Sequence, residues 1–145
     1  MSTLKDRILQ IMSQPQLSAL ATVTEEGKPW VRYVVAIADA GFKIRFASFV
    51  GSRKVIQIKR NSEVHLTCGA TDPAESKPYL QIQGRARFVT DHAERHLFWN
   101  DMLARVFSGP DDPAYGVVIV EPYRVEYCTP GNMEPEVWSI DAKEA

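Results

Sequence analysis

The chain has 145 residues and a formal net charge of −1, with 45% hydrophobic and 24% charged residues. This length is typical of a single domain spanning residues 1–145, and the apolar content excludes disorder for most of it. No apolar run approaches the roughly 20 residues of a membrane-spanning helix, so we expect a cytoplasmic protein with no signal peptide and no membrane partner. We expect no nucleic-acid partner either, because such partners normally need a clearly basic face.

Three segments are predicted to be helices. Each begins behind a residue that can cap a helix, namely Ser2 or Thr3 for the first, Ser52 for the second and Asp91 for the third. Apolar residues then recur at the spacing of one helical face. The predicted helices cover residues 4–14, 53–60 and 92–103.

Six segments are predicted to be strands, because apolar or β-branched residues run through them between turn-forming residues. The turns between the first three are too short for a crossover helix, so these strands are expected to be antiparallel. Gly84 interrupts its strand, as a bulge or bend would. An antiparallel barrel with peripheral helices is therefore expected, since closure removes exposed strand edges. The predicted strands cover residues 17–24, 30–38, 42–50, 64–68, 79–89 and 115–127.

The clearest sign of a binding site is the run Gly51-Ser52-Arg53-Lys54 at the start of the second helix. The helix dipole disfavours each cation in a first turn by some tenths of a kcal/mol, up to about 1 kcal/mol. A phosphate monoester would compensate these charges, and it would also accept hydrogen bonds from the Ser52 hydroxyl and the free amides of the first turn. The alternative is a solvated helix end with two surface cations.

Arg32 and Ser48 add polar groups to strands that are otherwise apolar. Arg32 lies in mid-strand among valines, where an unpaired guanidinium would be costly to bury. Ser48 continues the face of Ile44 and Phe46, where a hydroxyl could contact a bound polar group. The alternative for both residues is contact with water at the rim of a barrel.

Other side chains carry weaker signals. His92 and His96 stand at i and i+4, a geometry that can bind zinc, but no third ligand is evident in the sequence and we expect no metal site. Cys68 and Cys128 lack the short spacing of a zinc or redox pair and are expected to be buried free thiols. Trp99 is expected to be a core or dimer contact.

The segment RYVVAIADAGFKIRFASFVGSRKVIQIKRNSEVHL, which begins at Arg32, resembles the flavin-mononucleotide-binding split barrels related to pyridoxamine 5'-phosphate oxidase. The spacing from the strand arginine to the GSRK run carries this resemblance. The later segment FWNDMLARVFSGPDDPAYGVVIVEPYRVEY is similar to the bacterial general stress protein branch. The resemblance implies a mainly β, six-stranded antiparallel split barrel that binds FMN.

The resemblance also implies which residues hold the cofactor and how the chains assemble. The family forms homodimers with two flavins at the subunit interface. Gln81 and Gln83 share a strand face with Tyr79, which stands where the oxidases have a glutamine, and could replace it. Trp138 could cover a flavin across the dimer or anchor the C-terminal segment. The implied cofactor-binding residues are Arg32, Ser48, Ser52, Arg53, Lys54, Gln81, Gln83 and Trp138.

The expected function is that of an FMN-dependent oxidoreductase acting on an unidentified small substrate. No catalytic residue is assigned, because the redox chemistry belongs to the cofactor. Ile37 and Ala47 replace the lysine and the aromatic residue of the true oxidases, and the sequence ends at Ala145 without the arginine- and histidine-bearing segment that holds pyridoxamine phosphate. We therefore do not expect a pyridoxamine 5'-phosphate oxidase.

Three alternatives stay open. The same fold could hold a deazaflavin or haem, or the protein could bind flavin without turnover as a stress-related store or sensor. A nucleic-acid-binding barrel of the OB type needs aromatic residues interleaved with bases on one face, and only Lys43, Arg45 and Phe49 suggest one.

Overall fold

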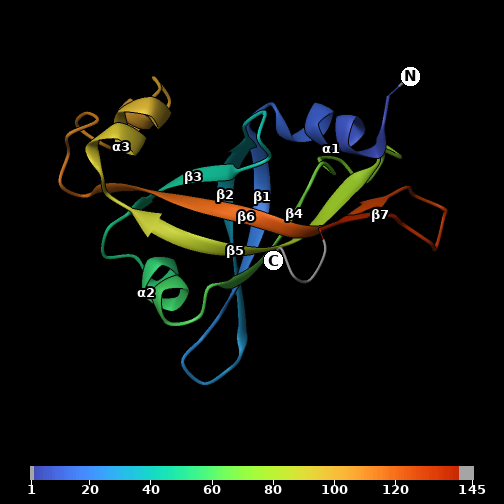
Figure 1. Ribbon diagram of the computed structural model, residues 1–145, viewed down its shortest axis with the longest axis horizontal. Coiled ribbons are helices and arrows are strands. Elements are labelled where there is room, and N and C mark those ends of the chain that lie inside the picture. Colours follow the sequence, from blue (N-terminus) through green and yellow to red (C-terminus); the bar gives the residue numbers. More distant parts are fainter. Residues whose placement is uncertain (1, 141–145) are drawn as a thin grey trace.

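The computed structural model describes residues 2–140, within which seven strands form one antiparallel sheet that closes on itself (Figure 1). The strands are β1 (Gln16–Val23), β2 (Pro29–Ala38), β3 (Ile44–Phe49), β4 (Glu63–Cys68), β5 (Tyr79–Val89), β6 (Tyr115–Cys128) and β7 (Glu136–Ser139). Their order is β3-β2-β1-β4-β5-β6-β7, and β3 also pairs with β6. Strands β1 to β6 therefore close into a barrel, and β7 is added at its edge. This confirms the predicted six-stranded antiparallel barrel. A barrel of the OB type has five strands.

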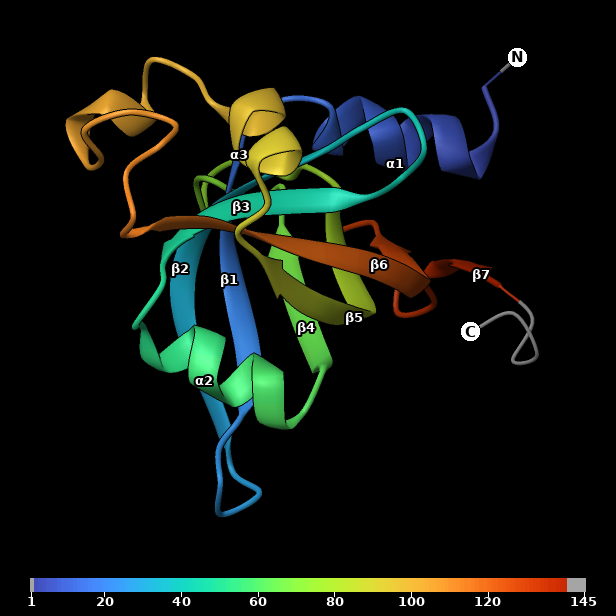
Figure 2. The same ribbon diagram turned by 60° about the vertical axis from the view of Figure 1, so that its left-hand side comes forward.

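Helices cover the two ends of the barrel, as Figure 2 shows. The helices are α1 (Leu4–Met12), α2 (Arg53–Arg60) and α3 (His92–Phe98), followed by a 3-10 turn, η1 (Leu103–Arg105). Thr3 rather than Ser2 caps α1, and it exchanges hydrogen bonds with Asp6 in a capping box. No helix within residues 2–140 is long and apolar enough to cross a membrane.

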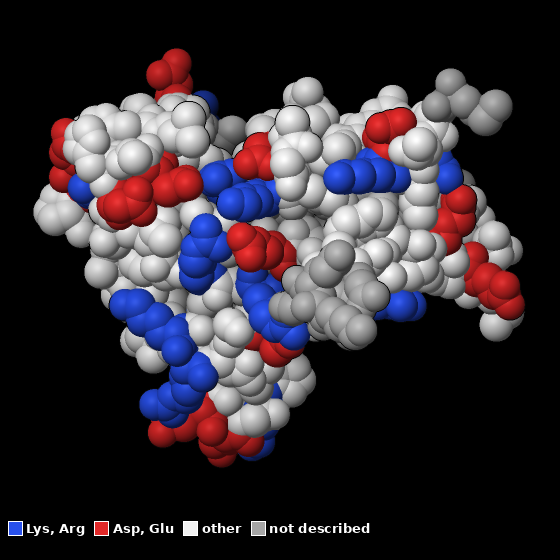
Figure 3. All heavy atoms as spheres, in the orientation of Figure 1, with Lys and Arg blue, Asp and Glu red and all other residues white. Residues whose placement is uncertain are grey.

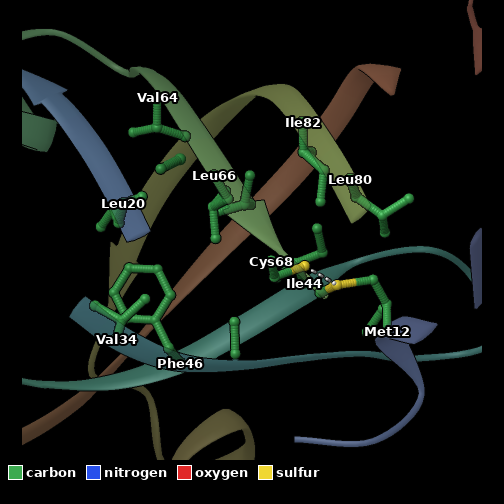
Figure 4. Packing of buried hydrophobic residues seen from close by; sticks show 14 of the residues in the cluster. Met12, Leu20, Val34, Ile44, Phe46, Val64, Leu66, Cys68, Leu80 and Ile82 are labelled. Atoms are coloured by element: carbon green, nitrogen blue, oxygen red, sulfur yellow. Dashed lines mark hydrogen bonds between the residues drawn. The ribbon is translucent and has the colours of Figure 1, made fainter. Parts of the chain in front are cut away.

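The core fills the barrel with alternate side chains from each strand (Figure 4). The predicted face of Phe42, Ile44 and Phe46 is buried throughout. Met12 enters from α1 and accepts a hydrogen bond from the Cys68 thiol, whose pKa burial raises to about 11. Cys68 is therefore the buried free thiol that we expected. Cys128 is also a free thiol, but it is only half-buried, so the prediction that it is buried was wrong.

The remaining differences from the predicted elements come from tertiary contacts. The third helix ends at Phe98 because Trp99 leaves the helical region at ψ 135° and packs edge-on against Tyr115, with ring centroids 5.5 Å apart. Phe42 has a φ of 69° and belongs to the turn before β3. The short strand β7 was not predicted. Its four residues are too few to give a clear strand pattern, and they are extended because they pair with the edge of β6.

Two neighbouring strands separate along most of their length, which positions the candidate site. The strand β2 has ten residues but pairs with β3 only at Ile37–Arg45 and Ala38–Ile44. From Phe46 to Phe49, β3 pairs only with β6, so β2 and this end of β3, which precedes α2, are not paired with each other. The barrel is therefore split at this point.

Gly84 marks the irregularity between β5 and β6 that its sequence predicted, with the register shift between Gln83 and Gly84. A Cβ atom at Gly84 would stand 2.7 Å from Val120 Cγ1 and 2.9 Å from the Glu121 carbonyl oxygen. We expect Gly84→Ala to lower the free energy of unfolding by about 1–3 kcal/mol, because strand backbone has to shift. Urea unfolding measures this change.

Gly109→Ala is the matched control, since a Cβ atom there would meet no atom within 4 Å. Equal unfolding midpoints for the two variants would contradict the close approach at Gly84.

Candidate functional site

The amino end of α2 presents hydroxyl and amide groups together. Ser52 caps the helix, and its hydroxyl accepts from the Val55 N–H at 3.4 Å. Its oxygen also lies 2.9 Å from that of Ser48, which is buried at the end of β3. Because the first N–H groups of a helix have no intrahelical acceptor, those of Arg53 and Lys54 are available to a ligand.

Arg32 reaches this helix from the inner face of β2. Its guanidinium donates to the carbonyls of Leu20 and Trp30, to the Thr22 hydroxyl at 2.7 Å and to the Gln57 side-chain oxygen at 2.9 Å. All four acceptors are neutral, so the geometry is fixed while the positive charge stays uncompensated. Burial, and secondly the charge of Arg53, lower the pKa of Arg32.

Lys54 and Arg53 complete a cluster of three cations with Arg32. Lys54 is half-buried, and burial together with the charge of Arg32 lowers its pKa. Arg53 is exposed, with its guanidinium 5.7 Å from the centre of the Trp30 ring. None of the three has a carboxylate partner within residues 2–140. We call Arg32, Arg53 and Lys54 the cation cluster.

The structure thus brings together five of the predicted site residues: Arg32, Ser48, Ser52, Arg53 and Lys54. Figure 3 shows basic side chains over α2 and the neighbouring strands. Some of these side chains form ion pairs. Arg87 on β5 pairs with Glu121, and Arg60 at the end of α2 pairs with Glu25. The members of the cation cluster differ from these two arginines in having no acidic partner within residues 2–140.

An apolar pocket of about 340 Å³ adjoins the cation cluster between β2 and β3. Ser48 and Lys54 lie at its polar side, and Asn100 contributes an amide. The opposite wall is the segment between α3 and β6. Apolar lining comes from Val35, Ile37, Phe49, Phe98, Met102, Leu103 and Phe107. The arrangement can hold an anionic group at α2 and a flat apolar group beside it.

The other three predicted residues lie elsewhere in the chain. Gln81 and Gln83 are on the outer face of β5, opposite Thr67 and His65 of β4. Trp138 lies on β7, where its ring packs against Phe42 with centroids 4.8 Å apart. A single chain therefore does not bring these three to the cation cluster, and their role in binding stays a prediction.

Sequence analysis missed several residues that build the site. Thr22 and Gln57 hold Arg32, and the segment from residue 98 to 107 lines the pocket. Thr22 gave a signal, because it is a polar residue that shares the buried face of β1 with Leu20 and lies opposite Trp30, near Arg32. Gln57 also gave a signal of a place near the site, since it stands three residues after Lys54 and therefore on the same face of the helix.

The residues that suggested an OB-type nucleic-acid surface have other partners. Arg45 donates to Glu94 at 3.0 and 3.2 Å, which attaches α3 to the barrel, and to Asp39 at 2.7 Å. Lys43 pairs with Glu121 at 3.9 Å, and Phe49 packs against Phe107. Both Arg45 and Lys43 therefore have acidic partners.

An apolar patch covers the outer face of β1 and β2 beside the pocket. Its members are Leu17, Val31, Tyr33 and Val35, which are 63%, 62%, 74% and 43% exposed. Leu17 and Val35 stand opposite each other across the two strands, as the strand register requires. Val35 also lines the pocket, so the patch and the pocket are continuous. We call these four residues the β1–β2 patch.

Fold and site together define a split β-barrel protein in which three unpaired cations lie at a helix terminus beside an apolar pocket. The chain belongs to the pyridoxamine 5'-phosphate oxidase family, whose sequence model matches residues 4–129. General stress protein 26 of Bacillus subtilis (strain 168) is similar to it, with 26% identity over 132 residues that cover 91% of this chain and 93% of that protein.

Two solved structures extend the comparison. The crystal structure of general stress protein 26 from Bacillus anthracis str. Sterne matches with a TM-score of 0.81 and 26% identity, covering 94% of this chain and 98% of that chain. The structure of an F420 reductase matches with a TM-score of 0.64 and 26% identity, covering 80% of this chain and 93% of that chain. Both relatives share the fold over most of their length.

Proposed function

We propose that this protein binds FMN and acts as an oxidoreductase on a small substrate, with the phosphate of FMN at the amino end of α2. The observation that carries the proposal is the cation cluster, three positive charges that have no acidic partner in residues 2–140 and influence one another. A phosphate dianion would neutralise two of these charges. Membership of the pyridoxamine 5'-phosphate oxidase family supports the same assignment.

Each group at this helix end would contribute differently to binding. Lys54 and Arg53 supply charge, Ser52 and Ser48 supply hydroxyls, and the first-turn amides supply donors without a partner. Hydrogen bonds to a charged group contribute about 1.5–3 kcal/mol each, so a few of them are enough for micromolar affinity. Arg32 is already fixed by neutral oxygens, so it acts chiefly through its charge.

The apolar pocket suits the flat tricyclic part of a flavin. Its volume of about 340 Å³ lies within the range of small-molecule sites. Val35, Ile37 and Phe107 would exclude water from the bound group, and Asn100 offers hydrogen bonds at the rim. When bound, the flavin supplies the redox chemistry, and this chain's residues position it and control access.

The proposal includes a homodimer formed through the β1–β2 patch. Contiguous apolar surface of this kind is a mark of association. Because Val35 belongs to both the patch and the pocket, a second copy seated on the patch would also form part of the pocket wall. The separation of Gln81, Gln83 and Trp138 from the cation cluster within one chain is compatible with their acting across such an interface.

The test is a titration of the purified protein with FMN, followed by flavin fluorescence and visible absorption. Riboflavin is the matched ligand, since it has the same ring system but no phosphate. We expect FMN to bind at least about tenfold more tightly than riboflavin, which corresponds to about 1.4 kcal/mol or more. Equal affinities for the two ligands would contradict a phosphate site at α2.

A second candidate keeps the site but replaces FMN with a deazaflavin, because the chain is similar to an F420 reductase. Parallel titrations with FMN, deazaflavin and haem distinguish these cofactors. Steady-state assays with nicotinamide donors then separate an oxidoreductase from a protein that only binds flavin. Turnover supports the enzyme, and a bound flavin that is never turned over supports the store or sensor.

A further inference from the structure

Three side chains that can hold a metal ion lie together at a place separate from the cation cluster. His92 and His96 occupy successive turns of α3, and the loop before β6 brings Asp111 against them. The Nε2 atom of His96 lies 2.7 Å from Asp111 Oδ1, and that of His92 lies 4.0 Å from the same oxygen. All three candidate ligand atoms lie within 4.8 Å of one another.

We propose that His92, His96 and Asp111 form a binding site for a divalent transition-metal ion such as Zn²⁺. Two imidazole nitrogens and one carboxylate oxygen are a donor set found in three-ligand zinc sites, where water takes a further position. Ligand atoms around a tetrahedral zinc ion stand about 3.3 Å apart, given bonds of about 2.0–2.2 Å. Small rotations of these three exposed side chains would reach that spacing.

The backbone that carries these ligands is already fixed. The Asp112 carboxylate accepts hydrogen bonds from the N–H groups of Ser108 and Ala114, both at 2.9 Å, and this holds the loop that presents Asp111. On the other side, Glu94 holds α3 to the barrel through its two hydrogen bonds from Arg45. Both supporting carboxylates are thus engaged, and Asp111 is the one directed at the histidines.

The local charge also favours a cation. Figure 3 shows acidic side chains gathered over α3 and its neighbouring loop, on a different part of the surface from the basic side chains over α2. The hydrogen bond with His96 holds the pKa of Asp111 below its usual value, so this ligand is an anion at neutral pH.

Metal binding at this site would affect the pocket wall. Residues 99–110 connect α3 to Asp111, and Asn100, Met102 and Phe107 of this segment line the apolar pocket. An ion bound by α3 at one end and Asp111 at the other would close the segment into a loop with fixed ends. The ion would then add a further link to the hydrogen bonds that already hold the two ends of this wall.

The test is a calorimetric titration of untagged, chelator-treated protein with ZnCl₂ at pH 7.5. We expect one zinc ion per chain, with an affinity that falls at least about tenfold in each of His92→Ala, His96→Ala and Asp111→Asn. MgCl₂ should give no comparable binding, because Mg²⁺ prefers oxygen ligands.

Asp101→Asn is the matched control, because Asp101 is an exposed carboxylate in the same segment. This variant should bind zinc as the unchanged protein does. Absence of zinc binding, or zinc binding that survives all three ligand substitutions, would overturn the proposal. The titration is made without flavin, so its outcome is independent of the proposed FMN site.

Discussion

Replacing Lys54 by methionine should weaken FMN binding by tenfold or more while making the ligand-free protein more stable. The loss of affinity follows because a charge-assisted contact to the phosphate is removed. The gain in stability follows because the ammonium group is half-buried and repelled by Arg32, which together lower its pKa. Methionine keeps most of the apolar stem and removes only the disfavoured charge.

The pH dependence of this gain has a definite sign. A lysine with a lowered pKa in the folded state binds its proton less tightly there than in the unfolded chain. The charged Lys54 therefore lowers the free energy of unfolding by its full amount at neutral pH. This destabilisation disappears as the pH rises towards the ordinary lysine pKa of about 10.4, where the side chain loses its proton. The stability difference between Lys54→Met and the unchanged protein should shrink over the same range.

Lys59→Met is the matched control on the same helix. Lys59 lies in the last turn of α2, where a cation stabilises the helix by about 0.3–1 kcal/mol, so this variant should lose stability. It should not change FMN affinity. Titrations with FMN and riboflavin, and urea unfolding of the ligand-free variants, measure both effects. An FMN affinity that Lys54→Met leaves unchanged, or a riboflavin affinity that falls equally, would sink the phosphate assignment.

Replacing Tyr33 by aspartate should convert the proposed homodimer into monomers at micromolar concentration. Tyr33 is the most exposed member of the β1–β2 patch, at 74% in the single chain. A carboxylate in the middle of an apolar interface would be buried without a partner, which costs several kcal/mol. Sedimentation equilibrium measures the change directly, and FMN titration of the monomer shows whether the pocket needs its second wall.

Met133→Asp is the control for the change at Tyr33. Met133 is 98% exposed in the loop before β7, outside the patch, so this variant should stay dimeric. A Tyr33→Asp protein that sediments as a dimer, or an unchanged protein that sediments as a monomer, would contradict the interface through this face.

Much of the local structure was predictable because it depends on neighbouring residues. The helix over residues 53–60 was predicted with the bounds that α2 has, since Ser52 caps it and a break precedes it. Alternation gave the buried face of β3, and Gly84 gave the register shift in β5. The same local signals brought Ser48, Ser52 and Lys54 to one site.

The errors concern contacts between distant segments. The third helix was predicted too long because nothing within it shows that Trp99 packs on Tyr115. The strand β7 was missed because it exists only as a partner of β6. The expectation of no metal site rested on the lack of a third ligand in the sequence near His92 and His96. The fold places Asp111 beside them, and whether the three bind a metal stays a prediction.

The sequence by itself determined the six barrel strands, the starts of the helices and the run of cations at α2, because alternation, capping and the helix dipole act over a few residues. Only the tertiary structure decided that β2 and β3 part after two pairs, that Gln57 and Thr22 hold Arg32, and that one wall of the pocket comes from residues 98–107. The physical reason is closure of the barrel. The pairing of β3 with β6 fixes the register of strands far apart in the chain, and no local pattern encodes that register.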